Sequence, residues 1–165
     1  MPVQMAAVAF DGTHTAEKEL SDLRTSRSDP WLNDVAVVEH HKGGRYSGTG
    51  PEYADPDRVD AGIAIGSGTG LLLGMIGGPL GLVFGATAGA ALGGAAGSSA
   101  PPAFDPLVAE VKDALPRGTS ALILLAEEPT TAKLVSAVGS TGRQVVRQEL
   151  TNDQLAELRQ AARSA

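Results

Sequence analysis

Three histidines are the side chains of this chain best suited to chemistry: His14, His40 and His41. Imidazole is a general acid or base and a common metal ligand near neutral pH. His40 and His41 are adjacent at the end of a predicted strand, where neighbouring side chains point to opposite faces, so one ion cannot easily hold both. His14 could complete a three-histidine site. We nevertheless expect exposed histidines at a hairpin end, with no metal and no other cofactor.

Other segments that resemble reactive sites lack the residues that their chemistry requires. Glu127 and Glu128 lie together at a predicted strand end, which favours a solvated rim over an acid/base pair. The stretch GSGTG at 66–70 has no following Gly-Lys-Ser/Thr and follows no predicted strand, so it is not a phosphate loop. The chain has no cysteine and no recognisable nucleophile–base motif. We therefore expect no enzyme activity.

Composition and charge restrict the partners and the location. The net charge is −6 and no basic cluster is present, which disfavours nucleic acid as a partner. The sequence MPVQMAAVAFDG at the start lacks a basic region followed by an apolar stretch, so no secretory signal is expected. A cytoplasmic or membrane-associated location follows from these features as an expectation.

The elements that must position these side chains can be predicted from apolar periodicity and from turn residues. The predicted strands are residues 3–10, 34–41, 45–50, 119–127 and 143–150, and the predicted helices are residues 15–27, 106–115, 130–138 and a last one from 151. The sequence KGG at 42–44 predicts a hairpin turn, and Thr151 with Gln154 predicts a capping box. Trp31 is expected to cover the small core.

This order predicts an α+β sandwich of the ferredoxin-like type, built from residues 1–50 and 105–165. Polar or proline-containing linkers at 51–60 and 98–104 enclose an insertion at 61–97. The insertion and its second linker belong to a stretch of 44 residues, 61–104, that carries no formal charge.

The insertion contains glycines at intervals of four residues. They form two ladders: Gly62, Gly66, Gly70, Gly74 and Gly78, then Gly81, Gly85, Gly89, Gly93 and Gly97. Ten glycines in helices would cost about 10 kcal/mol relative to alanine, so something must compensate. Residues four apart share one helix face, and a row of glycines lets another backbone approach closely. With a turn at residues 77–79, the sequence predicts an antiparallel helical hairpin, a glycine zipper.

The remaining faces of this hairpin are apolar and must be buried. We expect the ten glycines and five large side chains to form the oligomer or membrane interface. The five are Leu72, Leu73, Ile76, Leu82 and Phe84. A bilayer, copies of the same hairpin and the sheet of the chain itself are three possible partners. We expect a non-enzymatic self-assembling protein, a homo-oligomer, with membrane lipid as a second candidate partner. The alternative is a ferredoxin-like regulatory domain that binds a small ligand or a metal through the sheet face or through His40 and His41.

The chain resembles a bacterial and archaeal family of uncharacterised proteins, domain of unknown function 1269 (DUF1269). The resemblance is carried by AAVAFDGTHTAEKELSDL, DVAVVEHHKGGRYSGTG, the glycine ladder, DPLVAEVKDALPRGTSALILLAE and GRQVVRQELTNDQLAEL. It implies a ferredoxin-like body with a glycine-rich helical hairpin, and self-association or membrane attachment, in a setting related to stress. It implies no catalytic residues.

Overall fold

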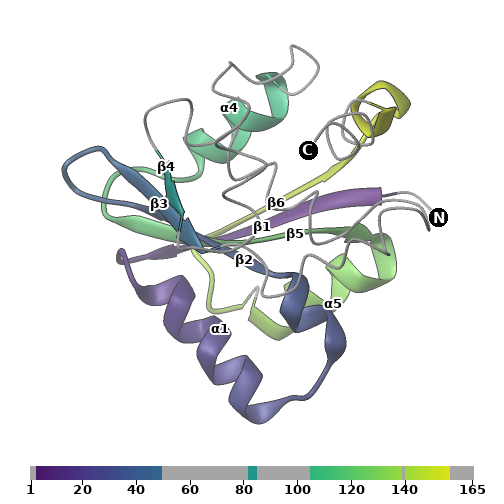
Figure 1. The fold of residues 1–165 in the computed structure, drawn as a ribbon, viewed down its shortest axis with the longest axis horizontal. Helices are drawn as coiled ribbons and strands as arrows, with labels where there is room; N and C mark the ends of the chain where they lie inside the picture. The colour runs from purple at the N-terminus through teal and green to yellow at the C-terminus, as the bar shows by residue number, and fades with distance from the viewer. Residues whose placement is uncertain (1–2, 50–81, 85–104, 139, 157–165) are drawn as a thin grey trace.

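The computed structural model describes residues 3–49, 82–84, 105–138 and 140–156 (Figure 1). The elements are β1 (Val3–Asp11), α1 (Thr15–Ser26), the 3-10 helix η1 (Pro30–Asp34), β2 (Ala36–His40), β3 (Tyr46–Thr49), β4 (Leu82–Phe84), α4 (Asp105–Asp113), β5 (Thr119–Glu127), α5 (Glu128–Val138) and β6 (Gln144–Glu149). A helical stretch at residues 152–156 follows. The strands and helices predicted for residues 3–49 and 105–156 are confirmed, with ends that shift by one or two residues.

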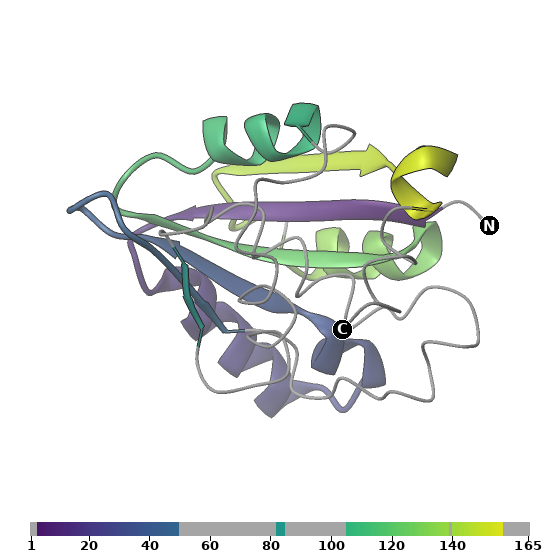
Figure 2. The ribbon, with the colours of Figure 1, turned by 45° about the horizontal axis from the view of Figure 1, so that its top comes forward.

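All six strands form one sheet in the order β4-β3-β2-β5-β1-β6. Strands β3, β2, β5, β1 and β6 pair antiparallel with one another, whereas β4 pairs parallel with β3 at the edge. Figure 2 shows β6, β1, β5 and β2 side by side. The fold class is therefore α+β with an antiparallel sheet, and β1 is a central strand, as its apolar residues on both faces predict.

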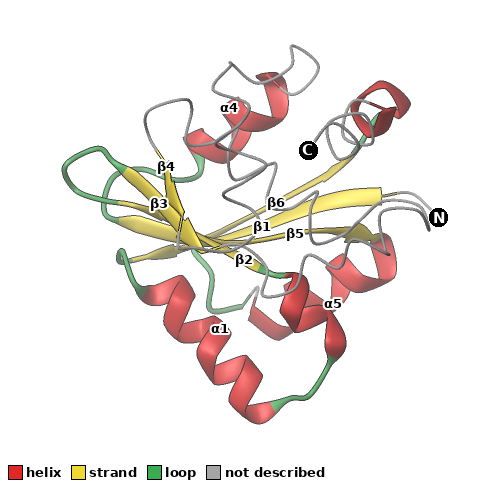
Figure 3. Cartoon of the chain, viewed as in Figure 1, coloured by secondary structure: helices red, strands yellow, loops and turns green. Residues whose placement is uncertain are grey.

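Helices cover the sheet on both sides. Helices α1 and α5 lie on one face and α4 lies on the other (Figure 3). Alternate residues of β1 serve the two layers because successive strand side chains point to opposite faces. Ala6, Val8 and Phe10 are buried with residues of α1 and α5, while Met5, Ala7 and Ala9 are buried with residues of α4.

Trp31 joins the layer beneath α1 and α5. It lies in η1, is 7% exposed, and packs in the same buried cluster as Leu20 of α1 and Leu134 of α5. The predicted role of Trp31 as a cover over the core is confirmed. The 3-10 helix around it begins at Pro30, whose fixed φ suits a first helical position.

The second ladder departs from the prediction at three residues. The helical arm expected after Gly81 is wrong at Leu82–Phe84, which form β4 with register Tyr46↔Leu82 and Gly48↔Phe84. Valine and phenylalanine favour strands, and pairing with the free edge of β3 satisfies their backbone groups. The ten ladder glycines, Leu72, Leu73, Ile76 and both linkers lie outside the described residues.

Candidate functional site: a histidine–carboxylate cluster

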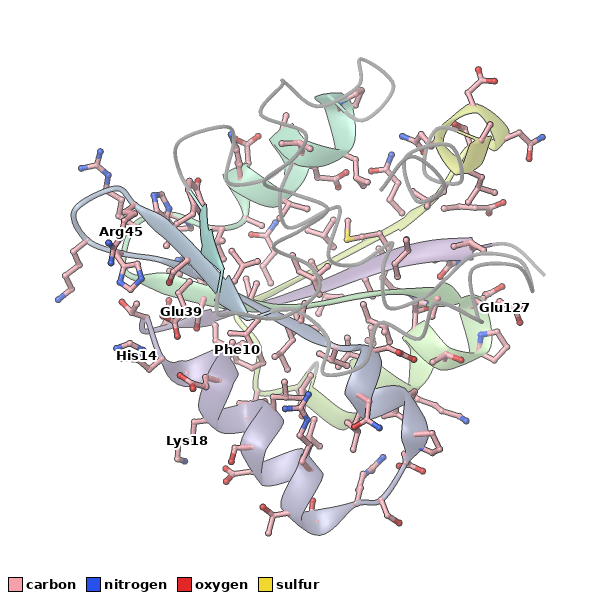
Figure 4. All side chains as sticks on the ribbon, in the orientation of Figure 1. Phe10, His14, Lys18, Glu39, Arg45 and Glu127 are labelled. Carbon is pink, nitrogen blue, oxygen red and sulfur yellow. The ribbon has the colours of Figure 1, made fainter. Side chains whose placement is uncertain are left out.

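A polar cluster lies where the start of α1 meets the β2–β3 hairpin. We call it the His14–Glu39 cluster; it comprises His14, Glu17, Glu39, His41 and Ser47. The Nδ1 atom of His14 is 3.1 Å from Oε1 of Glu39, although the two residues are 25 positions apart. Figure 4 shows both side chains at the same end of the sheet, His14 just before α1 and Glu39 on β2.

The start of α1 is held by a side chain from strand β5. His14 occupies the N-cap position but makes no side-chain cap hydrogen bond. Instead, the hydroxyl of Ser120 in β5 accepts a hydrogen bond from the backbone N–H of Ala16 at 2.9 Å and donates one to the carbonyl of Gly12 at 2.8 Å. Gly12 has φ +94, a conformation that favours glycine. The imidazole of His14 is therefore free to reach Glu39.

The hairpin places the other members by its register. Glu39 of β2 lies opposite Ser47 of β3, and His41 follows Glu39 by two residues on the same face. The backbone N–H of His41 donates to the carbonyl of Arg45 at 2.8 Å, and that of Gly44 donates to the carbonyl of His41 at 2.8 Å. These bonds close the predicted turn at residues 42–44.

A chain of hydrogen bonds holds the carboxylate of Glu39. The hydroxyl of Ser47 donates to Oε2 of Glu39 at 3.4 Å, and Nε2 of His41 lies 2.6 Å from the same hydroxyl. Because the one proton of Ser47 goes to Glu39, Nε2 of His41 must donate to the Ser47 oxygen. His41 Nε2 is also 3.6 Å from Oε2 of Glu39. The Glu39 side chain is only 13% exposed, so these partners compensate much of its lost hydration.

His40 lies on the opposite face of the hairpin and takes no part in this cluster. Its ring stacks on that of Tyr46, the residue opposite it on β3, with ring centroids 4.1 Å apart. Its Nδ1–H donates to the carbonyl of Leu115 at 2.7 Å. Burial raises the pKa of the Tyr46 phenol above its ordinary value. Nζ of Lys112 is 6.0 Å from the Tyr46 ring centroid.

The prediction that His40 and His41 cannot share an ion because they face opposite ways agrees with this arrangement. The expectation of simply exposed histidines is wrong for both, since each is partly buried and hydrogen-bonded. The three-histidine combination is not formed, because His40 is on the far face. Glu127 and Glu128 are exposed, as predicted. Figure 4 shows Glu127 far from Glu39.

Glu17 and Glu39 are the site residues that the sequence reasoning missed. One ligand atom from each of His14, Glu17 and Glu39 lies within 4.8 Å of the others. The available signal was the spacing of Glu39 and His41, two residues apart on a strand, which puts a carboxylate and an imidazole on one face. Nothing local indicates that α1 brings His14 and Glu17 to that face.

Within the described ranges, no helix has the length and apolar character needed to cross a bilayer. A family model described as "Protein of unknown function (DUF1269)" matches residues 63–163. This range includes nine of the ten ladder glycines, all but Gly62, together with α4, β5, α5 and β6, and it leaves out the residues of the His14–Glu39 cluster. No curated protein and no solved structure matches the chain.

Proposed function

We propose that this chain, which belongs to the DUF1269 family, is a non-enzymatic assembly protein that associates with copies of itself through residues 62–97. The observation that carries this proposal is the pair of ladders, each of five glycines spaced four residues apart, within 44 uncharged residues. A flexible linker would use Gly and Ser without spacing them by Leu, Ile and Val. The regular spacing therefore favours a contact surface.

The physical reason for the ladder is close approach of two backbones. Glycine costs about 1 kcal/mol per helical site relative to alanine, so a helix with a glycine row is poor by itself. Two such rows brought together gain dispersion contacts and Cα–H···O contacts along their whole length. This compensation requires a second glycine face. The other ladder of the same chain could supply it, and in our proposal a neighbouring copy of the chain supplies it.

Strand β4 interrupts residues 62–97 and so divides the proposed contact surface into two parts. Since Leu82–Phe84 pair with β3, the proposed helical contacts comprise Gly62–Gly78 before β4 and Gly85–Gly97 after it. The pairing with β3 attaches the segment to the edge of the body. A copy that docks on the ladders is then held close to the sheet rather than on a distant stalk.

The body that carries this segment is proposed to be of the ferredoxin-like type. Strands β1 and β2, joined through α1, have β5 between them, and β5 and β6, joined through α5, have β1 between them. Helices α1 and α5 share one face of the sheet (Figure 3). Two interlocked β-α-β units with this strand order support the classification. Strand β3, strand β4 and helix α4 are additions to it.

The mass of the protein in detergent-free solution tests the proposal. Light scattering after size-exclusion chromatography is expected to give a discrete multiple of 16.7 kDa for the wild type. Gly70→Leu and Gly85→Leu are expected to lower the mass, because a leucine on a ladder prevents close approach. Wild-type behaviour in both variants overturns the zipper, as does a wild-type monomer.

Gly68→Leu is the matched control for Gly70→Leu. The same side chain is added to the same segment, but two residues away and so about 200° around a helix from the ladder. The control is expected to assemble as the wild type does. Wild-type protein recovered only in the membrane fraction, and dissolved only by detergent, would show that lipid rather than a second copy buries the ladders.

A further inference from the structure

We propose that the His14–Glu39 cluster binds one divalent ion of a first-row transition metal, Zn²⁺ being the probe with which to test it. The ligands are Nδ1 of His14 and the carboxylates of Glu17 and Glu39. This proposal is independent of self-association, since none of the three residues belongs to the glycine segment.

The distances among the three ligand groups suit a tetrahedral ion. Zn²⁺ binds histidine nitrogen and carboxylate oxygen at about 2.0–2.1 Å, so neighbouring ligand atoms in a tetrahedron are about 3.3 Å apart. His14 Nδ1 and Glu39 Oε1 are 3.1 Å apart, and one atom from each of the three groups lies within 4.8 Å of the others. Glu17 is exposed, so its side chain can rotate toward an ion held by the other two ligands.

Two rigid elements hold the ligands. His14 and Glu17 are three residues apart at the start of α1, so their side chains share one side of the helix. Glu39 belongs to the sheet, and its Oε2 is held by the hydroxyl of Ser47, which His41 holds in turn. Metal sites commonly use such outer partners to orient a ligating carboxylate. Oε1 of Glu39 is left facing His14.

Exposure of the site allows an ion to enter and a water to complete its coordination. The His14 side chain is 76% exposed, whereas that of Glu39 is 13% exposed. One partly buried carboxylate with two accessible ligands gives an anchored site that opens to solvent. Three protein ligands and one open position are the arrangement of zinc sites that bind a water or a further molecule.

Charge and ligand type select the ion. Two carboxylates balance the charge of a divalent cation, and they outweigh the partial positive charge of the α1 N-terminus. The nearest lysine along α1, Lys18, lies 3.7 Å from Asp22 in an ion pair directed along the helix. An imidazole ligand favours Zn²⁺ and other first-row transition metals over Mg²⁺ and Ca²⁺, which prefer oxygen alone.

Calorimetric titration of the full, tag-free chain with ZnCl₂ tests this inference. The wild type is expected to bind one Zn²⁺ per chain and to show no comparable heat with MgCl₂. His14→Ala and Glu17→Gln are expected to weaken Zn²⁺ binding at least tenfold. Ser47→Ala is expected to weaken it about tenfold or more through loss of carboxylate orientation.

His40→Ala is the matched control, because it removes an imidazole one position from His41 but on the opposite face. It is expected to keep wild-type affinity for Zn²⁺. Circular dichroism without zinc establishes whether each variant is folded. Because Glu17 is exposed, Glu17→Gln keeps the test valid even if His14→Ala does not fold. The proposal is overturned if the wild type binds no Zn²⁺, if Glu17→Gln binds it as the wild type does, or if His40→Ala weakens binding equally.

Discussion

The hydroxyl of Ser120 accepts a hydrogen bond from the backbone N–H of Ala16, which lies 104 residues earlier in the chain, and so caps the start of α1. Ser120 is fully buried, and the same hydroxyl donates to the carbonyl of Gly12. One side chain thus satisfies a donor at the start of α1 and an acceptor in the turn before it. A capping function that is usually local has been transferred to the neighbouring strand.

Ser120→Ala is expected to lower the free energy of unfolding by about 1–3 kcal/mol, since the buried N–H of Ala16 and the carbonyl of Gly12 lose their partner. Urea unfolding followed by circular dichroism measures the change. The control is Ser136→Ala, the same substitution at an exposed position of α5, which is expected to change stability by less than about 0.5 kcal/mol. Equal effects of the two substitutions would contradict the role given to Ser120.

Gly44→Ala is expected to destabilise the β2–β3 hairpin by about 1–2 kcal/mol. Gly44 has φ +93, and a Cβ atom there would lie 2.9 Å from a guanidinium nitrogen of Arg117. Its neighbour Gly43 provides the control, because a Cβ at that position meets nothing within 4 Å. Thermal unfolding of the two alanine variants measures both changes in stability. An effect of Gly43→Ala as large as that of Gly44→Ala would refute the strain assigned to Gly44.

Leu124→Ala is expected to cost about 2–5 kcal/mol, because the side chain is completely buried between β5 and the α1–α5 layer. Val145→Ala on β6 is the comparison, since Val145 is 38% exposed and its loss is expected to cost at most about 1 kcal/mol. The midpoint of urea unfolding reports both values. A Leu124→Ala protein as stable as Val145→Ala would mean that this layer is not the core of the fold.

Tyr46→Phe is expected to reduce the loss of stability at alkaline pH. Burial raises the pKa of the Tyr46 phenol above 10.0, so the folded chain holds this proton more tightly than the unfolded chain does. The resulting stabilisation is fully present below about pH 10 and is lost as pH rises through the folded pKa. Urea unfolding between about pH 8 and 11 compares the two proteins. An identical pH dependence in both would exclude this contribution from Tyr46.

Much of the body could be predicted because its local signals agree with its tertiary structure. Strand β5 has eight consecutive buried residues followed by an exposed glutamate, and six of the eight, residues 121–126, are correspondingly apolar. The capping box at the last helix is formed as predicted: Thr151 N–H donates to Oε1 of Gln154 at 2.9 Å, and Gln154 N–H donates to Oγ1 of Thr151 at 3.2 Å. Such bonds depend on residues three apart, so a sequence displays them.

The cluster could be predicted only in part because it depends on pairing between distant segments. The opposite orientation of His40 and His41 follows from strand geometry alone. The approach of His14 to Glu39 requires that α1 lie beside β2, and that its first turn be fixed by Ser120 of β5. Strand β4 was not predicted, for a similar reason. Its three residues become a strand by pairing with β3, and not through an alternating pattern of their own.

The pairing of β1 has a consequence for synthesis of the chain. Its nine residues pair with β5 from Asp11↔Thr119 to Val3↔Glu127, and six of them pair with β6 from Ala9↔Gln144 to Gln4↔Glu149. This apolar strand is therefore synthesised more than a hundred residues before its partners. At about 5–20 residues per second, this interval on the ribosome lasts about 5–20 s. Until β5 emerges, β1 lacks both strand partners, and an unpaired apolar strand can pair with other chains.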